Sequence, residues 1–169
     1  MALACLLFGA AHAAQGGLEY PVKAAYLYKF APFVQWPDAA FDGPDAPFSL
    51  CVAGTDPFGA NLDQAIAGQR FGRHPVVVKR MARPDKASGC QILYVGGSKD
   101  AGEDLGRLKG APVLTVVDAV PGADSPAVIQ FVVIDNRVRF KIDEAVARQN
   151  GLVISSKLLS LAVSVRTGS

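Results

Sequence analysis

The side chains that most often catalyse reactions or hold metal ions are scarce in this sequence. Beyond residue 13 the chain has one histidine, His74, and two cysteines, Cys51 and Cys90. A lone histidine beside a proline is usually structural, and this set supports neither Cys/His catalysis nor a structural zinc site. The sequence therefore predicts no catalytic residue, no metal site and no cofactor.

Two glycine-containing turns are the candidates for ligand binding. Gly54-Thr55 and Gly96-Gly97-Ser98-Lys99 each follow a short apolar run, and backbone N–H groups at such turns attract anions. The second turn lacks the full phosphate-loop pattern, and helix capping alone would explain Ser98. Open α/β sheets bind ligands at the carboxyl ends of their strands. One hypothesis is therefore that these two turns bind a small anionic or aromatic ligand. Its possible binding residues are Thr55, Gly97, Ser98 and Lys99.

The apolar runs that precede these turns predict two buried strands. Residues 48–54 and 90–97 are apolar on both faces and end at glycine, which is typical of parallel strands covered by helices. Each run carries its cysteine near its start, and the spacing of neighbouring strands suits a disulfide between Cys51 and Cys90. A bridge would close a loop of 39 residues (90 minus 51) and stabilise the fold by roughly 4 kcal/mol. Two buried reduced thiols are the alternative.

The first residues are typical of an export signal. Residues 1–14 are apolar and uncharged, and they are too few to span a bilayer. Ala11-His12-Ala13 is a small-x-small site, so we expect a secretory signal of residues 1–13, cleaved after Ala13. Anchoring through a lipid on Cys5 and a non-signal N-terminus are the alternatives. Cleavage would remove Cys5 and leave an even number of cysteines, as an oxidising compartment favours.

Composition predicts one well-packed domain, residues 14–169. Half of the 169 residues are hydrophobic and 19% are charged, which excludes a disordered chain. The net charge is only +2, with lysines and arginines scattered along the chain, so charge gives no support to nucleic-acid binding.

Alternating strand and helix patterns predict an α/β fold. A helix begins near Pro21 and ends at Pro32, with Val22, Ala25, Tyr26, Phe30 and Phe33 at helical spacing. These aromatic side chains form either a core stripe or a partner-binding face. Further helices are predicted from Thr55-Asp56-Pro57 to Ala67 and over residues 99–108, and further strands over residues 76–81 and 112–117.

The last third of the chain predicts a hairpin and two helices. Residues 128–134 and 137–142 flank Asp135-Asn136, a pair that tolerates the positive φ angles of a two-residue turn. A short helix over residues 143–149 and a final helix capped by Ser155-Ser156 follow, the latter docking Leu158, Leu159, Leu161 and Ala162 on the core. The predicted fold is a single-domain α/β sandwich with a mostly parallel central sheet, a C-terminal antiparallel hairpin and helices on both faces.

An ordered set of short motifs resembles the YfiR family over nearly all of the chain beyond the leader. The set comprises Lys23-Ala24-Ala25-Tyr26, Phe30, Trp36-Pro37, the two cysteines, Val113-Leu114-Thr115, Arg137-Val138-Arg139-Phe140 and residues 151–159 (Gly-Leu-Val-Ile-Ser-Ser-Lys-Leu-Leu). The resemblance implies a periplasmic α/β protein, often dimeric, with a disulfide between Cys51 and Cys90. A second cysteine pair of some relatives is missing here, and Asp143 stands where relatives often have asparagine.

The resemblance also implies a function. The best-known members of the YfiR family repress an inner-membrane diguanylate cyclase by binding the cyclase's periplasmic sensor region. An outer-membrane lipoprotein can sequester the repressor. We therefore expect a periplasmic regulator that spans no membrane, forms a homodimer and acts by protein–protein contact. A periplasmic small-molecule sensor domain is the alternative. Partner contact is expected on the exposed side of residues 23–36 and near Arg139, with the candidates Lys23, Tyr26, Phe30, Trp36 and Arg139.

Overall fold

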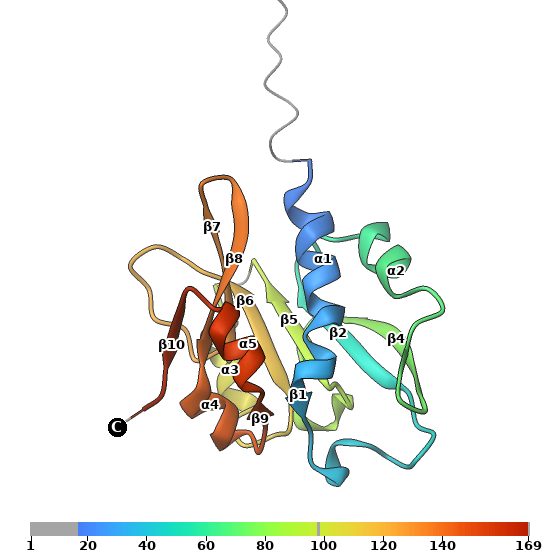
Figure 1. Cartoon of the computed structure of the whole chain (residues 1–169). Helices are drawn as coiled ribbons and strands as arrows, with labels where there is room; N and C mark the ends of the chain where they lie inside the picture. The colour runs from blue at the N-terminus through green and yellow to red at the C-terminus, as the bar shows by residue number, and fades with distance from the viewer. Residues whose placement is uncertain (1–16, 98, 169) are drawn as a thin grey trace, which may run out of the picture.

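The computed structural model describes residues 17–97 and 99–168, and a twisted sheet forms its centre (Figure 1). In this part of the chain the main sheet has eight strands in the order β10-β8-β7-β6-β5-β2-β4-β3. From one edge to the other these are Ser164–Arg166, Arg137–Asp143, Ile129–Ile134, Leu114–Asp118, Ile92–Gly96, Phe48–Gly54, His74–Met81 and Arg70–Phe71. The predicted leader, residues 1–13, lies outside the described residues.

The middle of the sheet is parallel and doubly wound. Strand β2 pairs in parallel with both β4 and β5, and β5, β6 and β7 continue in parallel. The chain therefore leaves β2 toward β4 and then returns to the opposite side of β2 to build β5, β6 and β7. This reversal places a topological switch point between the carboxyl ends of β2 and β5, where sheets of this type bind ligands.

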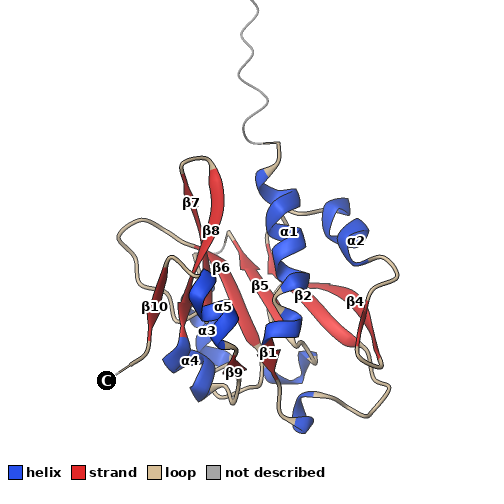
Figure 2. Cartoon of the chain, viewed as in Figure 1, coloured by secondary structure: helices blue, strands red, loops and turns tan. Residues whose placement is uncertain are grey.

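Helices cover both faces of the sheet, as predicted (Figure 2). Helices α1 (Glu19–Lys29) and α2 (Ala60–Ile66) pack on one face, and α3 (Ala101–Arg107) packs on the other. Helices α4 (Glu144–Gln149) and α5 (Ser156–Leu161) join the cluster of α1 through Ala147 and Leu158. The predicted fold class is confirmed.

The two cysteines form a disulfide on the α3 side of the sheet. Their Cα atoms lie 5.9 Å apart, and both side chains are buried in the cluster beneath α3. Cys51 lies within β2 and pairs with Leu93, whereas Cys90 precedes the first residue of β5. The bridge therefore ties the middle of β2 to the amino-terminal end of β5.

The hairpin forms as its turn residues predict. Asp135 and Asn136 both have positive φ angles, 49° and 56°, and they join β7 to β8 in an antiparallel pair. Asp143, the departure from the family pattern, caps α4 by accepting a hydrogen bond of 3.0 Å from the N–H of Val146. Its other oxygen lies 2.5 Å from Nε of Arg166 in β10, so the carboxylate also holds the last strand.

The buried stripe of α1 differs from the predicted one. Ala24 and Leu27 are fully buried together with Phe30, whereas Val22 is 39% exposed. The reason is steric: α1 approaches the sheet most closely through a small and an aliphatic side chain, which leaves the bulky tyrosines at its flanks. The prediction weighted the aromatic positions too heavily.

Two further expectations need correction. Helix α2 begins at Ala60 instead of Pro57, because the Asp56 carboxylate accepts hydrogen bonds from the N–H groups of Phe58 and Gly59 and forms a separate turn first. Leu161 is 63% exposed, since α5 ends there and only one turn of it reaches the core.

Some short elements were not predicted. They are a two-stranded sheet of β1 (Val34–Gln35) and β9 (Val153–Ile154), and 3-10 turns at Ala31–Phe33, Asp38–Ala40 and Lys86–Ser88.

Removing the disulfide is expected to lower the free energy of unfolding by roughly 4 kcal/mol, the entropy of closing a loop of this length. The variant replaces Cys51 and Cys90 with serine, and urea denaturation of the purified proteins gives the difference. Wild-type protein treated with dithiothreitol should move to the same midpoint. Equal midpoints for oxidised protein and variant would contradict the prediction.

Candidate functional site

A crevice opens at the switch point between the carboxyl ends of β2 and β5. Thr55 follows β2, Gly97 follows β5, and Lys99 precedes α3; all three line one cavity of about 470 Å³. Tyr94 and Asp118 also line it, from the end halves of β5 and β6. The structure thus brings together three of the four residues predicted to bind a ligand. The fourth, Ser98, lies outside the described residues.

The two turns are in direct backbone contact at this crevice. The N–H of Thr55 donates a 3.2 Å hydrogen bond to the carbonyl of Gly96. A Cβ atom at Gly96 would lie 2.0 Å from the carbonyl oxygen of Thr55, so only glycine fits between the strand ends. Arg80 of β4 fixes the following residue, because its Nε lies 2.7 Å from Oδ2 of Asp56. Thr55 is therefore held in place by its own hydrogen bond to Gly96 and by the contact between its neighbour Asp56 and Arg80.

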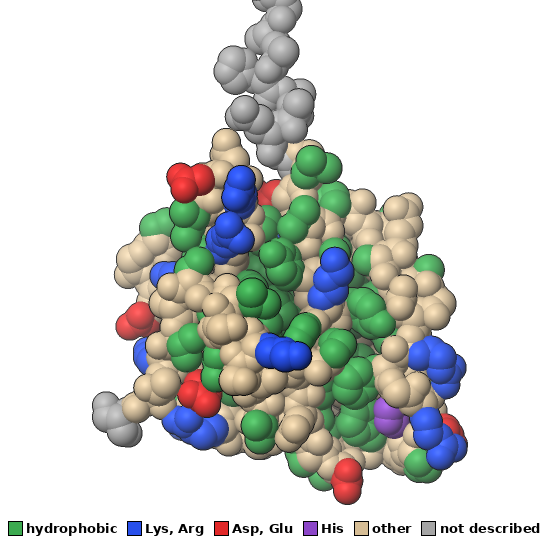
Figure 3. All heavy atoms as spheres, viewed as in Figure 1, with side chains coloured by type: hydrophobic (Ala, Val, Ile, Leu, Met, Phe, Trp, Pro, Cys, Tyr) green, Lys and Arg blue, Asp and Glu red, His purple; other side chains and the backbone are tan. Residues whose placement is uncertain are grey.

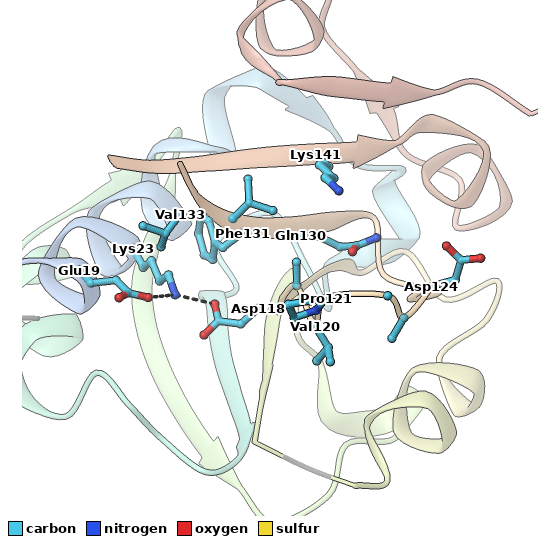
Figure 4. A pocket seen from close by; sticks show the side chains of 14 residues that line it. Glu19, Lys23, Asp118, Val120, Pro121, Asp124, Gln130, Phe131, Val133 and Lys141 are labelled. Carbon is cyan, nitrogen blue, oxygen red and sulfur yellow. Dashed lines mark hydrogen bonds and ion pairs between the residues drawn. The ribbon is translucent and has the colours of Figure 1, made fainter. Parts of the chain in front are cut away.

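A second cavity, of about 690 Å³, adjoins the first (Figure 4). The loop from Ala119 to Asp124 forms one wall, and Gln130 and Val133 of β7 with Lys141 of β8 form another. Asp118 and Val120 line both cavities. The two cavities therefore lie side by side at the carboxyl end of β6, whose last residue is Asp118.

Two ion pairs that share one buried lysine lie where the two cavities meet. Lys23 of α1 is 3% exposed, and its Nζ lies 2.5 Å from Oε1 of Glu19 and 2.9 Å from Oδ1 of Asp118 (Figure 4). The same ammonium group lies 4.8 Å from the centre of the Tyr20 ring, a cation–π distance. Lys23 therefore joins the first helix to the end of β6.

The surroundings of Lys23 keep it protonated. Burial by itself lowers the pKa of Lys23, but hydrogen bonds and charges from Glu19 and Asp118 outweigh it and raise the pKa above its ordinary value. Burial, with the nearby Asp118 carboxylate, raises the pKa of Tyr94 well above its usual range. A lysine nucleophile needs a lowered pKa, so Lys23 is not activated as a nucleophile, and its contacts hold α1 against the end of β6.

Of the five predicted partner-binding residues, the structure buries two. Lys23 and Phe30 are 3% and 1% exposed, so neither side chain is available to another protein. Trp36 packs against Phe48 and Phe71 and donates a 3.1 Å hydrogen bond to the carbonyl of Gln91. These residues hold α1 and the following turn on the sheet.

The remaining two, Tyr26 and Arg139, meet at a groove between α1 and the hairpin. This groove has a volume of about 530 Å³. Most of its apolar lining comes from Val22 of α1, Leu18 just before that helix, and Val133 and Val138 of the hairpin. Arg137 and Asn136 complete its rim. Residues far apart in the sequence thus form a second candidate site, for a protein partner.

Sequence reasoning did not identify Glu19, Tyr94 or Asp118 as site residues. Asp118 follows the apolar run of β6, just as Thr55 and Gly97 follow β2 and β5. A polar residue at the end of a third parallel strand was therefore the available signal. No comparable signal identifies Glu19, because the orientation of α1 decides its position. Across residues 17–97 and 99–168, no group of three His, Cys, Asp or Glu side chains is arranged to hold a metal ion.

Comparison with known protein families shows the family to which this chain belongs. The model of the YfiR/HmsC-like family matches residues 20–163, from the start of α1 to just beyond α5. The chain belongs to the YfiR/HmsC-like family. No curated protein matches its sequence.

The family is one of periplasmic regulatory proteins associated with diguanylate cyclases. None of the described helices has both the length and the apolar character needed to cross a membrane. In this YfiR/HmsC-like chain, α1 lines both the crevice at the switch point, through Tyr20, and the groove beside the hairpin, through Val22 and Tyr26.

Replacing Lys23 with methionine is expected to lower the free energy of unfolding at neutral pH by about 2 kcal/mol. Loss of one partner from a fully buried pair costs about 3–5 kcal/mol, and the effect is smaller here because the two carboxylates, 32% and 33% exposed, can still contact water. Urea denaturation gives the difference, with Lys29→Met, an exposed position on the same helix, as the control.

The sign of the pH dependence follows from the raised pKa. A raised pKa in the folded state gives stability that is present below the unfolded value of about 10.5 and is lost as the pH rises through the folded value. The difference between wild type and the Lys23→Met variant should therefore shrink in alkaline solution. A constant difference across that range would contradict the assignment.

Proposed function

We propose that this protein is a periplasmic regulator that binds the periplasmic sensor region of an inner-membrane diguanylate cyclase and lowers its activity. The family match carries this proposal, because it spans almost the whole described domain, including most of the residues that line both candidate sites. In this proposal residues 1–13 direct export and are then removed. An outer-membrane lipoprotein that sequesters the regulator and a homodimeric state belong to the same proposal.

The chemistry of the described residues agrees with a role in binding. The buried lysine is held protonated by two carboxylates, and the disulfide suits an oxidising compartment. Both features stabilise a rigid domain whose cavities and grooves lie at its surface. Such a domain can change the activity of a partner by binding one of the partner's conformations in preference to another.

Deleting the gene is expected to raise cyclic di-GMP and biofilm formation, because the cyclase loses its repressor. Mass spectrometry of cell extracts measures the nucleotide. Complementation with the full chain should restore the low level, whereas a chain that starts at residue 14 without any leader should not. An unchanged nucleotide level after deletion would refute the proposal.

A ligand-sensing role is the second candidate, and the cavity at the switch point favours it. Its lining combines the Thr55 hydroxyl, the Lys99 ammonium group and the ring of Tyr94, which suit a small anionic or aromatic molecule. A ligand bound there would contact the ends of β2 and β5 together. It could thereby shift the domain between two conformations with different affinities for the partner.

Benzoate, a minimal aromatic anion, is a suitable first probe for this cavity. We expect millimolar benzoate to raise the melting temperature of the wild-type protein, because a ligand that binds only the folded state stabilises it. The Lys99→Glu variant should lose this response, while Lys109→Glu, an exposed lysine outside the cavity, should keep it. The same rise in all three proteins would show that benzoate binds elsewhere.

A further inference from the structure

The groove between α1 and the hairpin is lined by large apolar side chains that are exposed to solvent. Leu18, Val22 and Val133 are 71%, 39% and 50% exposed, and each lines the groove. Leu18, which caps α1, and Val22 and Tyr26 within it follow one another at intervals of four residues, so they form a single stripe about 12 Å long along the helix axis. Figure 3 shows apolar side chains gathered along α1 beside Lys and Arg side chains over the hairpin.

The hairpin that forms the other wall projects beyond the sheet (Figure 1). Strand β6 pairs with β7 only at Ile129–Phe131, and β10 pairs with β8 only at Lys141–Asp143. In the described chain the strand pairing of residues 132–139 is therefore confined to the hairpin itself. The projecting part of the hairpin thus contributes no pairing to the other strands of the sheet, but it forms one wall of the groove.

The rim of the groove carries unbalanced positive charge. Arg137 and Arg139 are exposed, and in the described parts of the chain neither forms an ion pair. Glu19 is the acidic residue that lines the groove, and its carboxylate is bound to Lys23. An occupant with negative charge beside its apolar surface would therefore be complementary to this rim.

We propose that this groove binds an amphipathic helix of the partner whose apolar face is flanked by acidic residues. The inference rests on the proposed function, since it places the contact with the cyclase's periplasmic region here. A helix presents side chains at intervals of three and four residues, which matches the stripe of α1. A strand added to β8 would leave that stripe uncovered. A second copy using the same face would bring two pairs of arginines together.

Binding of the purified periplasmic region of the cyclase, measured by calorimetry, tests the proposal. Val22→Asp places a charge in the apolar stripe, and Arg139→Glu reverses the charge of the rim. Each change is expected to weaken binding by at least about tenfold, because the first buries a charge in the apolar contact and the second replaces a complementary charge on the rim with a repulsive one. The matched controls are Leu161→Asp and Lys109→Glu, exposed residues of the same types outside the groove. Circular dichroism confirms that all four variants fold.

The outcomes separate this inference from the proposed function. If the wild-type protein does not bind the cyclase region, the proposed function fails. If the wild type binds and the two groove variants bind equally well, the groove assignment alone is overturned. Sedimentation of the same variants completes the test: a change from dimer to monomer with unaltered cyclase binding would assign the groove to a second copy and overturn the proposal. Restored binding of Arg139→Glu to a cyclase region with one acidic residue changed to lysine would support direct contact.

Discussion

The position of α1 depends on one buried charge. Lys23 reaches between Glu19 of its own helix and Asp118 at the end of β6, with an exposed fraction of only 3%. Hydrophobic packing through Ala24 and Leu27 holds the helix against the sheet, but such packing is not directional. The two ion pairs add a defined direction, because the ammonium group needs both carboxylates. They thereby set how far α1 extends over the carboxyl ends of the strands, and α1 lines both candidate sites.

The sequence was informative where local chemistry alone determines the structure. The Asp135-Asn136 turn, the strands that end at Gly54 and Gly96, and the Ser155 cap all depend on neighbouring residues, and all were predicted. The pairing of Val34 with Ile154 and the exposure of Leu161 were not, because they depend on contacts between distant segments. Periodicity shows that a helix has an apolar side. It does not show which flank approaches the sheet most closely.

The candidate sites were predictable to a similar extent. Glycine-containing turns after two parallel strands pointed to Thr55, Gly97 and Lys99, since the carboxyl ends of parallel strands gather at one edge whatever the rest of the fold does. Tyr26 and Arg139 were both named as partner contacts, yet only the folded chain shows that they share a groove. Lys23 and Phe30 were misjudged for a physical reason: a lysine can be buried when two carboxylates compensate its charge, and a sequence does not reveal that compensation.

The disulfide and the crevice lie at different heights in the sheet. Cys90 precedes β5 and Cys51 sits in mid-β2, whereas Thr55 and Gly97 follow the last residues of these strands. The disulfide therefore fixes β2 and β5 to each other near the amino-terminal end of β5. The carboxyl ends of the two strands, at the crevice, are held together by non-covalent contacts alone. Structural adaptation to an occupant is expected at those carboxyl ends, with the disulfide-bonded end acting as a fixed reference. One end of the strand pair is thus covalently fixed, while the opposite edge remains free to adapt to an occupant.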